Sequence, residues 1–308
     1  MNKKAKVLIT GGAGFIGSHL SNKLSQDNFD ILVVDNLSKG KSKNLNKNIK
    51  LVEQDIQNKK FIKTLQKFKP DYLFHLAAQT SLTRSQKDPK AEFENNFLPI
   101  IEILETAKKT KLKKIIFASS AAVYGNCKVL PIKENAPANP ISPYGISKLA
   151  AENYIKYFSK EFKLPYVILR YANVFGPRQD FTSEGGVVAI FASKMLSGEN
   201  IPIYGTGKQT RDFIFVEDVV SANIKSLNKR LEGVYNIGTS HEVSVLDLYK
   251  NIRKMVKTKS RVKFKSTISP GVTRSALSSY LFQQKTGFKA KYALAIGLEK
   301  TIDYFKQK

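Results

Sequence analysis

The sequence predicts an α/β protein with a doubly wound parallel sheet and a smaller C-terminal α/β lobe. Short runs of β-branched and aliphatic residues alternate with amphipathic stretches through the first half of the chain. The first run leads into a glycine-rich turn, and the second run ends in an aspartate. Such alternation is typical of a parallel sheet with helices on both faces. At 308 residues the chain is long enough to form two lobes.

The individual elements follow from apolar spacing. Continuous apolar runs are typical of strands buried on both faces, and we predict strands at residues 6–9, 31–35, 50–53, 72–76, 114–119 and 166–171. Apolar residues at helical spacing predict helices that include residues 18–24, 61–68, 97–109 and 144–162. After Tyr171 the turns become rich in glycine and proline. We therefore divide the chain into a first domain at 1–171 and a second lobe at 172–308, with segments near 213–220 and 234–237 as candidates for a return to the first domain.

A glycine-rich turn joins the first predicted strand to the first predicted helix. In the sequence TGGAGFIG at residues 10–17, Gly11, Gly14 and Gly17 permit a tight turn and close approach of main-chain amides to a ligand. Amides at a helix N-terminus favour a pyrophosphate. About twenty residues later, Asp35 can accept hydrogen bonds from ribose hydroxyls and would repel a 2′-phosphate. This predicts a Rossmann-type domain that binds NAD; the alternative is an ordinary turn in which Asp35 caps a helix.

Composition excludes several classes of protein. The apolar fraction of 42% is that of a globular protein, and no apolar run approaches the roughly 18 residues of a membrane span. The basic N-terminus precedes too few apolar residues for a secretory signal. Cys127 is the single cysteine, and the histidines His19, His75 and His241 lack metal-ligand spacing. We expect a cytoplasmic protein that uses no metal and binds no membrane.

The net charge of +26, from 51 Lys and Arg against 25 Asp and Glu, would suit a polyanion such as RNA. However, the lysines are spread over the whole chain, and the runs at 39–50, 59–69 and 108–114 are typical of polar helix faces and loops. We expect no specific nucleic-acid binding. A positive field would still attract a doubly charged nucleotide-sugar.

Two residues that could transfer protons, Tyr144 and Lys148, lie four residues apart after Pro143, which suits a first helical turn. A neighbouring ammonium and a nicotinamide cation would lower the phenol pKa from about 10. Ser119 and Ser120 end a predicted strand at the carboxyl edge of the sheet, where ligands of doubly wound folds bind. Either hydroxyl could relay a proton to Tyr144. Taken alone, these patterns are more typical of a surface tyrosine on an amphipathic helix and of a serine turn at the end of a strand.

In combination these motifs resemble the extended short-chain dehydrogenase/reductases, in particular the NAD-dependent nucleotide-sugar epimerases of the UDP-glucose 4-epimerase type. The resemblance covers nearly the whole chain, at residues 10–20, 35–37, 55–56, 75–79, 119–125, 144–148, 169–178, 203–213 and 235–238. It implies that Tyr144 is the acid/base, Lys148 its tuning partner and Ser120 the hydroxyl relay. It also implies a homodimer formed through two long helices near 97–109 and 144–162.

The resemblance implies a set of cofactor and substrate contacts. For NAD they are Gly11, Gly14, Phe15, Ile16, Gly17, Asp35, Asn36, Asp55, Ile56, Leu76, Ala77, Ala78, Gln79, Asn95, Ser119, Tyr144 and Lys148. For a UDP-sugar they are Ser81, Ser120, Tyr144, Asn173, Val188, Tyr204, Arg211 and Arg274. Asn173 is expected at the diphosphate or sugar, Tyr204 on the uracil and Arg211 at the pyrophosphate. The ordinary alternatives are a turn residue, a core tyrosine and an ion pair with Asp212.

The residues after Ser120 discriminate among activities of this family. Dehydratases of this family carry Asp-Glu or Glu in the stretch that matches residues 119–125, and decarboxylases tend to carry Glu there. In this chain Ala121 and Ala122 stand at those positions, and neither can transfer a proton. Cys127 lies beyond the motif and is interpreted as an incidental thiol. We expect NAD-dependent 4-epimerisation of a UDP-hexose or UDP-N-acetylhexosamine through a transient 4-keto sugar. The alternatives are a nucleotide-sugar reductase, dehydratase or decarboxylase of the same fold and, more remotely, a non-catalytic NAD- or RNA-binding module.

The C-terminal region departs from the family pattern. Ser269 and Ser279 replace an expected arginine and aspartate, and Arg274 matches a second expected arginine that would then carry more of the diphosphate charge. Ala276 falls at a position where, in the family it resembles, the size of the side chain limits the sugar pocket. A residue as small as alanine would admit an N-acetyl group. The sequence leaves the base and the sugar open.

Overall fold

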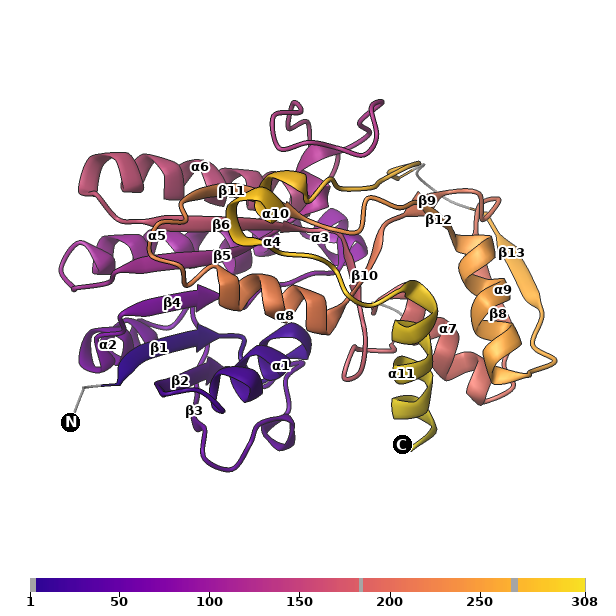
Figure 1. The fold of residues 1–308 in the computed structure, drawn as a ribbon, viewed down its shortest axis with the longest axis horizontal. Helices are drawn as coiled ribbons and strands as arrows, with labels where there is room; N and C mark the ends of the chain where they lie inside the picture. The colour runs from indigo at the N-terminus through magenta and orange to yellow at the C-terminus, as the bar shows by residue number, and fades with distance from the viewer. Residues whose placement is uncertain (1–3, 183–184, 267–270, 308) are drawn as a thin grey trace.

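The computed structural model describes residues 4–182, 185–266 and 271–307. Its central strands are β1 (Ala5–Thr10), β2 (Phe29–Asp35), β3 (Lys50–Glu53), β4 (Tyr72–His75), β5 (Lys114–Ser120), β6 (Tyr166–Tyr171) and β11 (Gly233–Ile237). They form a seven-stranded parallel sheet in the order β11-β6-β5-β4-β1-β2-β3 (Figure 1). The chain winds outward in both directions from β1 and β4, so the predicted fold class is confirmed.

Both faces of this sheet carry an apolar core, because successive side chains of a strand point to opposite faces. Val7 and Ile9 of β1 belong to one core, together with residues of α1 (Phe15–Leu24), α8 (Val216–Lys225) and α10 (Tyr280–Thr286). Leu8, between them, belongs to the opposite core, together with residues of α2 (Lys59–Phe68), α5 (Leu98–Ala107) and α6 (Pro143–Phe162). The sheet is therefore sandwiched between two helical layers.

Shorter elements connect these layers. They are η1 (Ser42–Asn44) after β2, α3 (Leu82–Lys87) and α4 (Pro89–Asn96) after β4, and η2 (Ala121–Tyr124) after β5. Asp88 separates α3 from α4, and its carboxylate accepts a hydrogen bond from Ala91 N at 2.9 Å, capping α4. None of the helices in the described ranges is long and apolar enough to cross a bilayer.

The second half of the chain builds a smaller lobe. Its elements are β7 (Asn173–Phe175), α7 (Val187–Leu196), β8 (Ile201–Tyr204), β9 (Thr210–Arg211), β10 (Phe213–Phe215), β12 (Val243–Ser244), α9 (Val245–Val256), β13 (Val262–Lys265) and α11 (Leu294–Lys306). The pairs β10-β7, β12-β9 and β13-β8 form small sheets, and Phe191, Leu248 and Leu298 share one core. Figure 1 shows α7, α9 and α11 together at the right, while α8 lies beside α1 and β11 beside β6.

A buried ion pair joins α6 to β6 behind the carboxyl edge of the sheet. Arg170 donates to the Glu152 carboxylate from Nε at 2.9 Å and from Nη2 at 2.5 Å. Ser119 Oγ also donates to Glu152, at 2.6 Å, and Arg170 Nη1 donates to Tyr124 Oη at 2.8 Å. Glu152 is 0% exposed and Arg170 is 4% exposed. The pair therefore fixes the middle of α6 against the strands that lead to the site.

Arg170→Met should lower the free energy of unfolding by about 3–5 kcal/mol, because the buried Glu152 carboxylate loses its two direct hydrogen bonds to a guanidinium and keeps Lys156, at 3.7 Å, as an ion-pair partner. Urea denaturation measures this loss. Arg230→Met, which removes an exposed guanidinium, should change the free energy of unfolding by less than about 0.5 kcal/mol. Similar losses in the two variants would contradict the structural role of the Glu152–Arg170 pair.

Candidate active site

The carboxyl end of β5 and the start of α6 meet at one place. Ser142 caps α6 by accepting a hydrogen bond from Gly145 N at 3.1 Å, and Pro143 occupies the first helical position. A Cβ on Gly145 would lie 2.6 Å from the carbonyl oxygen of Ala122. The glycine thus allows α6 to approach the turn after β5, and this approach brings Tyr144 to Ser120.

Ser120, Tyr144 and Lys148 form one cluster there. The Ser120 hydroxyl is hydrogen-bonded to the Tyr144 hydroxyl. Lys148 Nζ donates to the carbonyl oxygen of Ala118 at 2.9 Å and lies 5.8 Å from the centroid of the Tyr144 ring. Lys148 is 3% exposed, whereas Tyr144 and Ser120 are half-buried. The cluster therefore holds a relay hydroxyl, a phenol and an ammonium within one small volume.

The pKa values of this pair move away from the values expected from sequence. Burial raises the pKa of Tyr144 to about 12, and the Glu92 carboxylate raises it too, while the hydrogen bond from Ser120 lowers it. Burial lowers the pKa of Lys148 to about 8, against the raising effects of Glu92 and Glu152. Without cofactor, the net shift of the phenol pKa is therefore upward and not downward as expected, because loss of hydration is its largest cause.

The glycine-rich turn has the shape that a dinucleotide requires. Gly11 has a φ of +67°, and a Cβ there would lie 2.7 Å from Ala77 N. A Cβ on Gly17 would lie 2.1 Å from the carbonyl oxygen of Gly11, so α1 packs directly on the turn. Gly14 is the N-cap of α1, so the amides of Phe15, Ile16 and Gly17 lie in its first turn, where N–H groups have no intrahelical partner. These donors and the helix dipole fit a pyrophosphate.

Asp35 ends β2 beside this turn. Its Oδ2 accepts a hydrogen bond from Ala13 N and its Oδ1 accepts one from Leu37 N, both at 2.9 Å. The N-caps of α1 and η1 are Gly14 and Lys41, so Asp35 does not cap a helix. The carboxylate therefore fixes the glycine-rich turn by hydrogen bonds. It also lies at the carboxyl end of β2, where the sequence predicts the ribose.

Two hydrogen-bonded side-chain pairs lie beyond Asp35, on the side predicted to hold the adenine. Asn36 Nδ2 donates to Asp55 Oδ2 at 2.8 Å, and Gln57 Nε2 donates to Asn95 Oδ1 at 2.8 Å. Ile56 lies between these pairs in the sequence and packs on the second core. The structure therefore gathers the residues predicted for the adenine end at the carboxyl ends of β2 and β3. Leu76, Ala77 and Ala78 follow β4 and are half-buried beside the glycine-rich turn.

Gln79 and Ser81, which were predicted to contact ligands, are hydrogen-bonded within the protein. Gln79 Nε2 donates to Glu92 Oε2 at 2.7 Å and to the carbonyl oxygen of Ser81 at 3.0 Å, and its Oε1 accepts a hydrogen bond from Ser81 N. Ser81 Oγ accepts from Arg84 N at 3.1 Å and caps α3. Both side chains are thus hydrogen-bonded within the protein, and their contacts with ligands stay a prediction. Glu92, which the sequence prediction missed, is the buried partner of Gln79.

In the smaller lobe, the side chains predicted for the substrate differ in exposure. Tyr204 is 57% exposed, which rejects the core alternative, and Asn173 is exposed on β7. Val188 is 1% exposed within the core of the lobe, so its side chain cannot contact substrate; its N–H lies in the first turn of α7.

Arg211 and Asp212 do not form the ion pair that was the alternative interpretation. Arg211 Nη1 donates to the carbonyl oxygen of Thr210 at 2.7 Å, and none of the ion pairs in the described ranges includes Arg211. The Asp212 carboxylate instead accepts from Thr239 N and Leu277 N, each at 3.0 Å. Burial lowers the pKa of the Arg211 guanidinium. A half-buried cation without a carboxylate partner suits an anionic ligand.

The C-terminal loop gives Arg274 a partner within the protein. Its Nε and Nη2 donate to the two Glu242 oxygens at 3.0 and 2.5 Å, so a neighbouring carboxylate already opposes its charge. Ser279 Oγ accepts from Gly238 N at 2.7 Å and donates to Gly238 O at 2.8 Å, which gives this serine a structural role. Ala276 is 1% exposed and does not line an open pocket. Ser269 lies outside the described residues.

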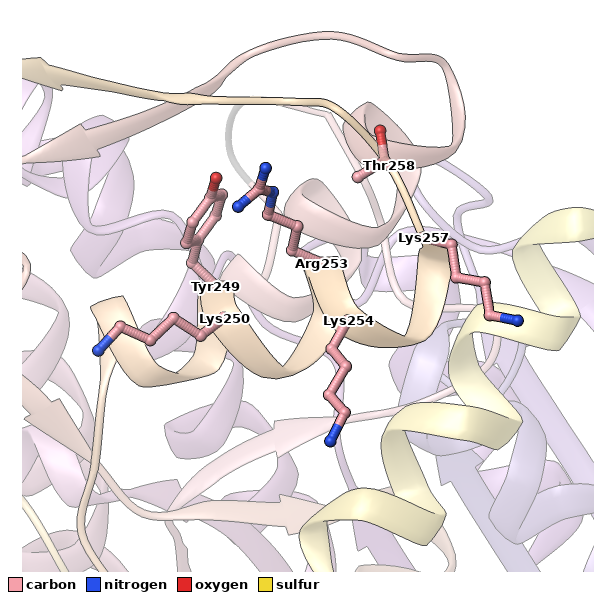
Figure 2. Close-up of a pocket in the computed structure, with 6 residues that line it drawn as sticks. All are labelled: Tyr249, Lys250, Arg253, Lys254, Lys257 and Thr258. Carbon is pink, nitrogen blue, oxygen red and sulfur yellow. The ribbon is translucent and has the colours of Figure 1, made fainter.

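A separate groove follows α9 and shows how the positive charge is distributed. It is lined by Tyr249, Lys250, Arg253, Lys254, Lys257 and Thr258 (Figure 2). The cationic side chains point in different directions from the helix, and Lys250 Nζ lies 3.2 Å from Asp247 Oδ1. The groove therefore does not converge on a single anion. Within the described ranges, no group of three or more His, Cys, Asp or Glu residues could hold a metal ion.

Comparison with known families agrees with this geometry. The model of the NAD dependent epimerase/dehydratase family matches residues 7–238. The chain belongs to this family. The predicted resemblance is thereby confirmed, and so is NAD as the cofactor, in agreement with the carboxylate at Asp35 and the glycine-rich turn. The chain is an enzyme of the NAD-dependent epimerase/dehydratase type.

Similar members of the family extend over almost the whole chain. A Methanocaldococcus jannaschii protein described as a putative UDP-glucose 4-epimerase is 39% identical over 301 residues, which are 97% of this chain and 98% of that one. The structure of Thermotoga maritima UDP-glucose 4-epimerase with UDP-glucose has a TM-score of 0.94 and 40% identity, covering 98% and 99% of the two chains. Methanobrevibacter ruminantium UDP-N-acetylglucosamine 4-epimerase, in complex with UDP-N-acetylmuramic acid, has a TM-score of 0.93 and 35% identity, covering 99% of each.

Proposed function

We propose that this enzyme inverts C4 of a UDP-hexose or UDP-N-acetylhexosamine through a transient 4-keto sugar. The observation that carries the proposal is the cluster of Ser120, Tyr144 and Lys148 with Ala121 and Ala122 directly beside it. The cluster supplies proton transfer to and from one hydroxyl. The two alanines, half-buried in η2, supply no further acid or base for elimination or decarboxylation.

NAD and the clustered side chains have distinct roles in this reaction. NAD, when bound, accepts the C4 hydrogen as hydride and returns it, and its cationic ring favours the Tyr144 phenolate. Tyr144 would take the proton of the C4 hydroxyl during oxidation and give it back to the same oxygen when hydride returns to the opposite face of C4. Ser120 is hydrogen-bonded to Tyr144 and relays that proton. Lys148 holds a positive charge beside the phenol, which offsets the cost of ionising a buried tyrosine.

Binding of the UDP group is assigned to the smaller lobe. The exposed Tyr204 ring offers a stacking face for a base, and Arg211 offers a guanidinium that can bind phosphate through two N–H groups. The exposed Asn173 amide offers hydrogen bonds to the diphosphate or sugar. These assignments are supported by exposure and charge.

The test is turnover with a panel of nucleotide-sugars, without added cofactor. Interconversion of UDP-glucose with UDP-galactose, or of UDP-GlcNAc with UDP-GalNAc, supports the proposal. A panel of UDP-, dTDP- and GDP-sugars separates the alternatives. Net formation of NADH indicates a dehydrogenase, consumption of supplied NADH a reductase, loss of water a dehydratase, and CO₂ release from a sugar that carries a carboxylate a decarboxylase. Failure to convert any of the four UDP-sugars would count against the proposal.

Removal of the carboxylate beside Arg274 should improve substrate binding. Glu242→Gln should lower KM for the UDP-sugar by up to about fivefold at unchanged kcat, because the Glu242 carboxylate no longer competes with the diphosphate for Arg274. Steady-state kinetics at low salt measure the change. Glu199→Gln removes a carboxylate paired with Lys194 on the same lobe and should leave KM unchanged. A higher KM in Glu242→Gln would contradict this role of the pair.

The helices α4, α5 and α6 present an apolar surface that suits a homodimer. Its large apolar side chains are Phe93, Leu98, Tyr154, Tyr157 and Phe162, each 40–57% exposed. Phe93 stacks on Phe97 at 4.4 Å between ring centroids, and Phe97 contacts Tyr154 edge-on at 4.9 Å. Contiguous apolar surfaces of this kind mark interfaces between chains, so we assign this face to a second copy.

Disruption of this face should convert a dimer to a monomer. Tyr157→Glu should weaken self-association at least about 30-fold, the equivalent of about 2 kcal/mol for a central aromatic side chain. Sedimentation equilibrium measures the association constant. Tyr280→Glu, on α10, removes an aromatic ring that is 63% exposed outside this face and should leave the dimer intact. A monomeric wild-type protein would contradict the assignment.

A further inference from the structure

A buried carboxylate, Glu92, lies next to the cluster of Ser120, Tyr144 and Lys148 without belonging to it. Glu92 is on α4 and is 2% exposed. It accepts hydrogen bonds from Gln79 Nε2 at 2.7 Å, from Ser147 Oγ at 2.8 Å and from Asn96 Nδ2. These donors come from the segment after β4, from α6 and from α4 itself, and all three are neutral.

This arrangement leaves the carboxylate hydrogen-bonded but without a contacting cation. Within the described ranges, none of the ion pairs includes Glu92. A buried charge is costly unless a nearby opposite charge balances it. The buried cation that responds to Glu92 is Lys148, whose pKa the carboxylate raises, and Glu92 also raises the pKa of Tyr144.

The other charged groups around Lys148 do not take over this role. Glu152, one helical turn along α6, is already paired with Arg170 on β6. His75 on β4 stacks on Phe117 at 5.9 Å, and burial lowers its pKa to about 3, so it is neutral. The basic side chains of α3, Arg84 and Lys87, are exposed to solvent, and β5 and η2 contribute no charged side chain near the cluster. Glu92 is thus the buried carboxylate near Lys148 that has no guanidinium partner.

The same carboxylate has a second, geometric role. Ser147 precedes Lys148 in α6, and Gln79 follows the Ala77-Ala78 segment that lines the predicted cofactor groove. Because Glu92 bonds both, it connects the helix that carries the acid/base to the segment beside the cofactor. A shift of either element would break a hydrogen bond to a buried charge, which costs more than a neutral bond.

We propose that Glu92 is a positioning residue of the proposed epimerase reaction, which fixes α6 against the segment after β4 and supplies the buried negative charge that balances Lys148. The inference rests on the proposed function, since it assigns Glu92 a role in proton transfer by Tyr144. Removing the charge should make Lys148 lose its proton more readily and should make Tyr144 ionise more readily.

The test is the pH profile of kcat for the NAD-loaded enzyme and its variants. In Glu92→Gln the acidic limb, set by Tyr144, and the basic limb, set by Lys148, should both move to lower pH by about one unit, with a lower maximum. Glu92→Asp keeps the charge and should leave both limbs in place. Glu94→Gln, which removes a surface carboxylate from the same helix, should leave the whole profile unchanged. A loss of packing alone would lower the maximum of Glu92→Gln without moving its limbs, and that result would overturn the proposal.

A second variant keeps the inference testable if Glu92→Gln does not fold. Ser147→Ala removes the bond to α6 while leaving the carboxylate, so kcat should fall about tenfold at an unshifted profile, and unchanged kcat would overturn the positioning role. The content of bound NAD and the urea midpoint of each variant show whether the fold is retained. If the wild-type enzyme converts no UDP-sugar, the proposed function fails; if it turns over but the Glu92→Gln limbs stay in place, the inference on Glu92 alone fails.

Discussion

Tyr144→Phe should reduce kcat by about 10²–10⁴-fold while the protein keeps its NAD. The substitution removes the hydroxyl that is hydrogen-bonded to Ser120, and general acid/base groups contribute rate factors of this size. The ring itself remains, so the packing of α6 against η2 is retained. Steady-state kinetics with the UDP-sugar, together with the ratio of bound NAD to protein, measure the two effects separately.

The matched control is Tyr280→Phe, which removes a phenol hydroxyl from a residue that is 63% exposed on α10. Its kcat should equal that of the wild type. If Tyr144→Phe retained more than about a tenth of wild-type kcat, Tyr144 would not be the proton carrier. If the variant lost its NAD instead, the loss of activity would reflect cofactor binding rather than proton transfer.

Gly17→Ala should abolish NAD binding and, with it, activity. A Cβ on Gly17 would lie 2.1 Å from the carbonyl oxygen of Gly11, far inside contact distance, and the contact is with main chain rather than a flexible side chain. The glycine-rich turn must therefore move away from α1. That movement displaces the amides that face a pyrophosphate, so the loss should reach at least about 100-fold in affinity, or roughly 3 kcal/mol.

Gly271→Ala is the control for the glycine variant. A Cβ at Gly271 meets nothing within 4 Å, so this variant should bind NAD as the wild type does. Isothermal titration with NAD on cofactor-stripped protein measures both variants. Wild-type affinity in Gly17→Ala would show that the turn between β1 and α1 does not hold the cofactor.

The central sheet was predictable because each strand is a continuous apolar run between turn residues. Residues 50–53 and 166–171 were predicted as strands and match β3 and β6 at both ends, and the helix over residues 18–24 proved to start earlier, at Phe15. The start was missed because Gly17, a poor helix former, lies inside the first turn. Pairing of β11 with β6 depends on contacts across many residues, which apolar spacing does not encode.

The proton-transfer cluster was predictable because motif spacing determines it, whereas its electrostatics were not. Tyr144 and Lys148 share a helical face by their spacing alone. Their pKa shifts depend on burial and on Glu92, which is distant in sequence and forms part of a helix with ordinary polar composition. A carboxylate and an amide four residues apart, Glu92 and Asn96, were the available signal.

The partners of side chains that bond residues distant in the sequence could not be predicted either. The Glu242 carboxylate opposite Arg274 and the hydrogen bonds that engage Gln79 follow from tertiary packing, which local patterns do not show. Short-range motifs therefore predicted the glycine-rich turn and the proposed acid/base pair, but they did not show which of the predicted ligand-binding side chains are hydrogen-bonded within the protein.

The most direct test of the central claim is an NMR assay of UDP-galactose and UDP-GalNAc conversion in D₂O with no added cofactor. If the enzyme inverts C4 by hydride removal and return, the product is the C4 epimer with protium retained at C4, and no NADH accumulates. Deuterium at C4 would contradict hydride return. Loss of water from the sugar, or no conversion of either sugar by the NAD-loaded protein, would contradict C4 epimerisation itself.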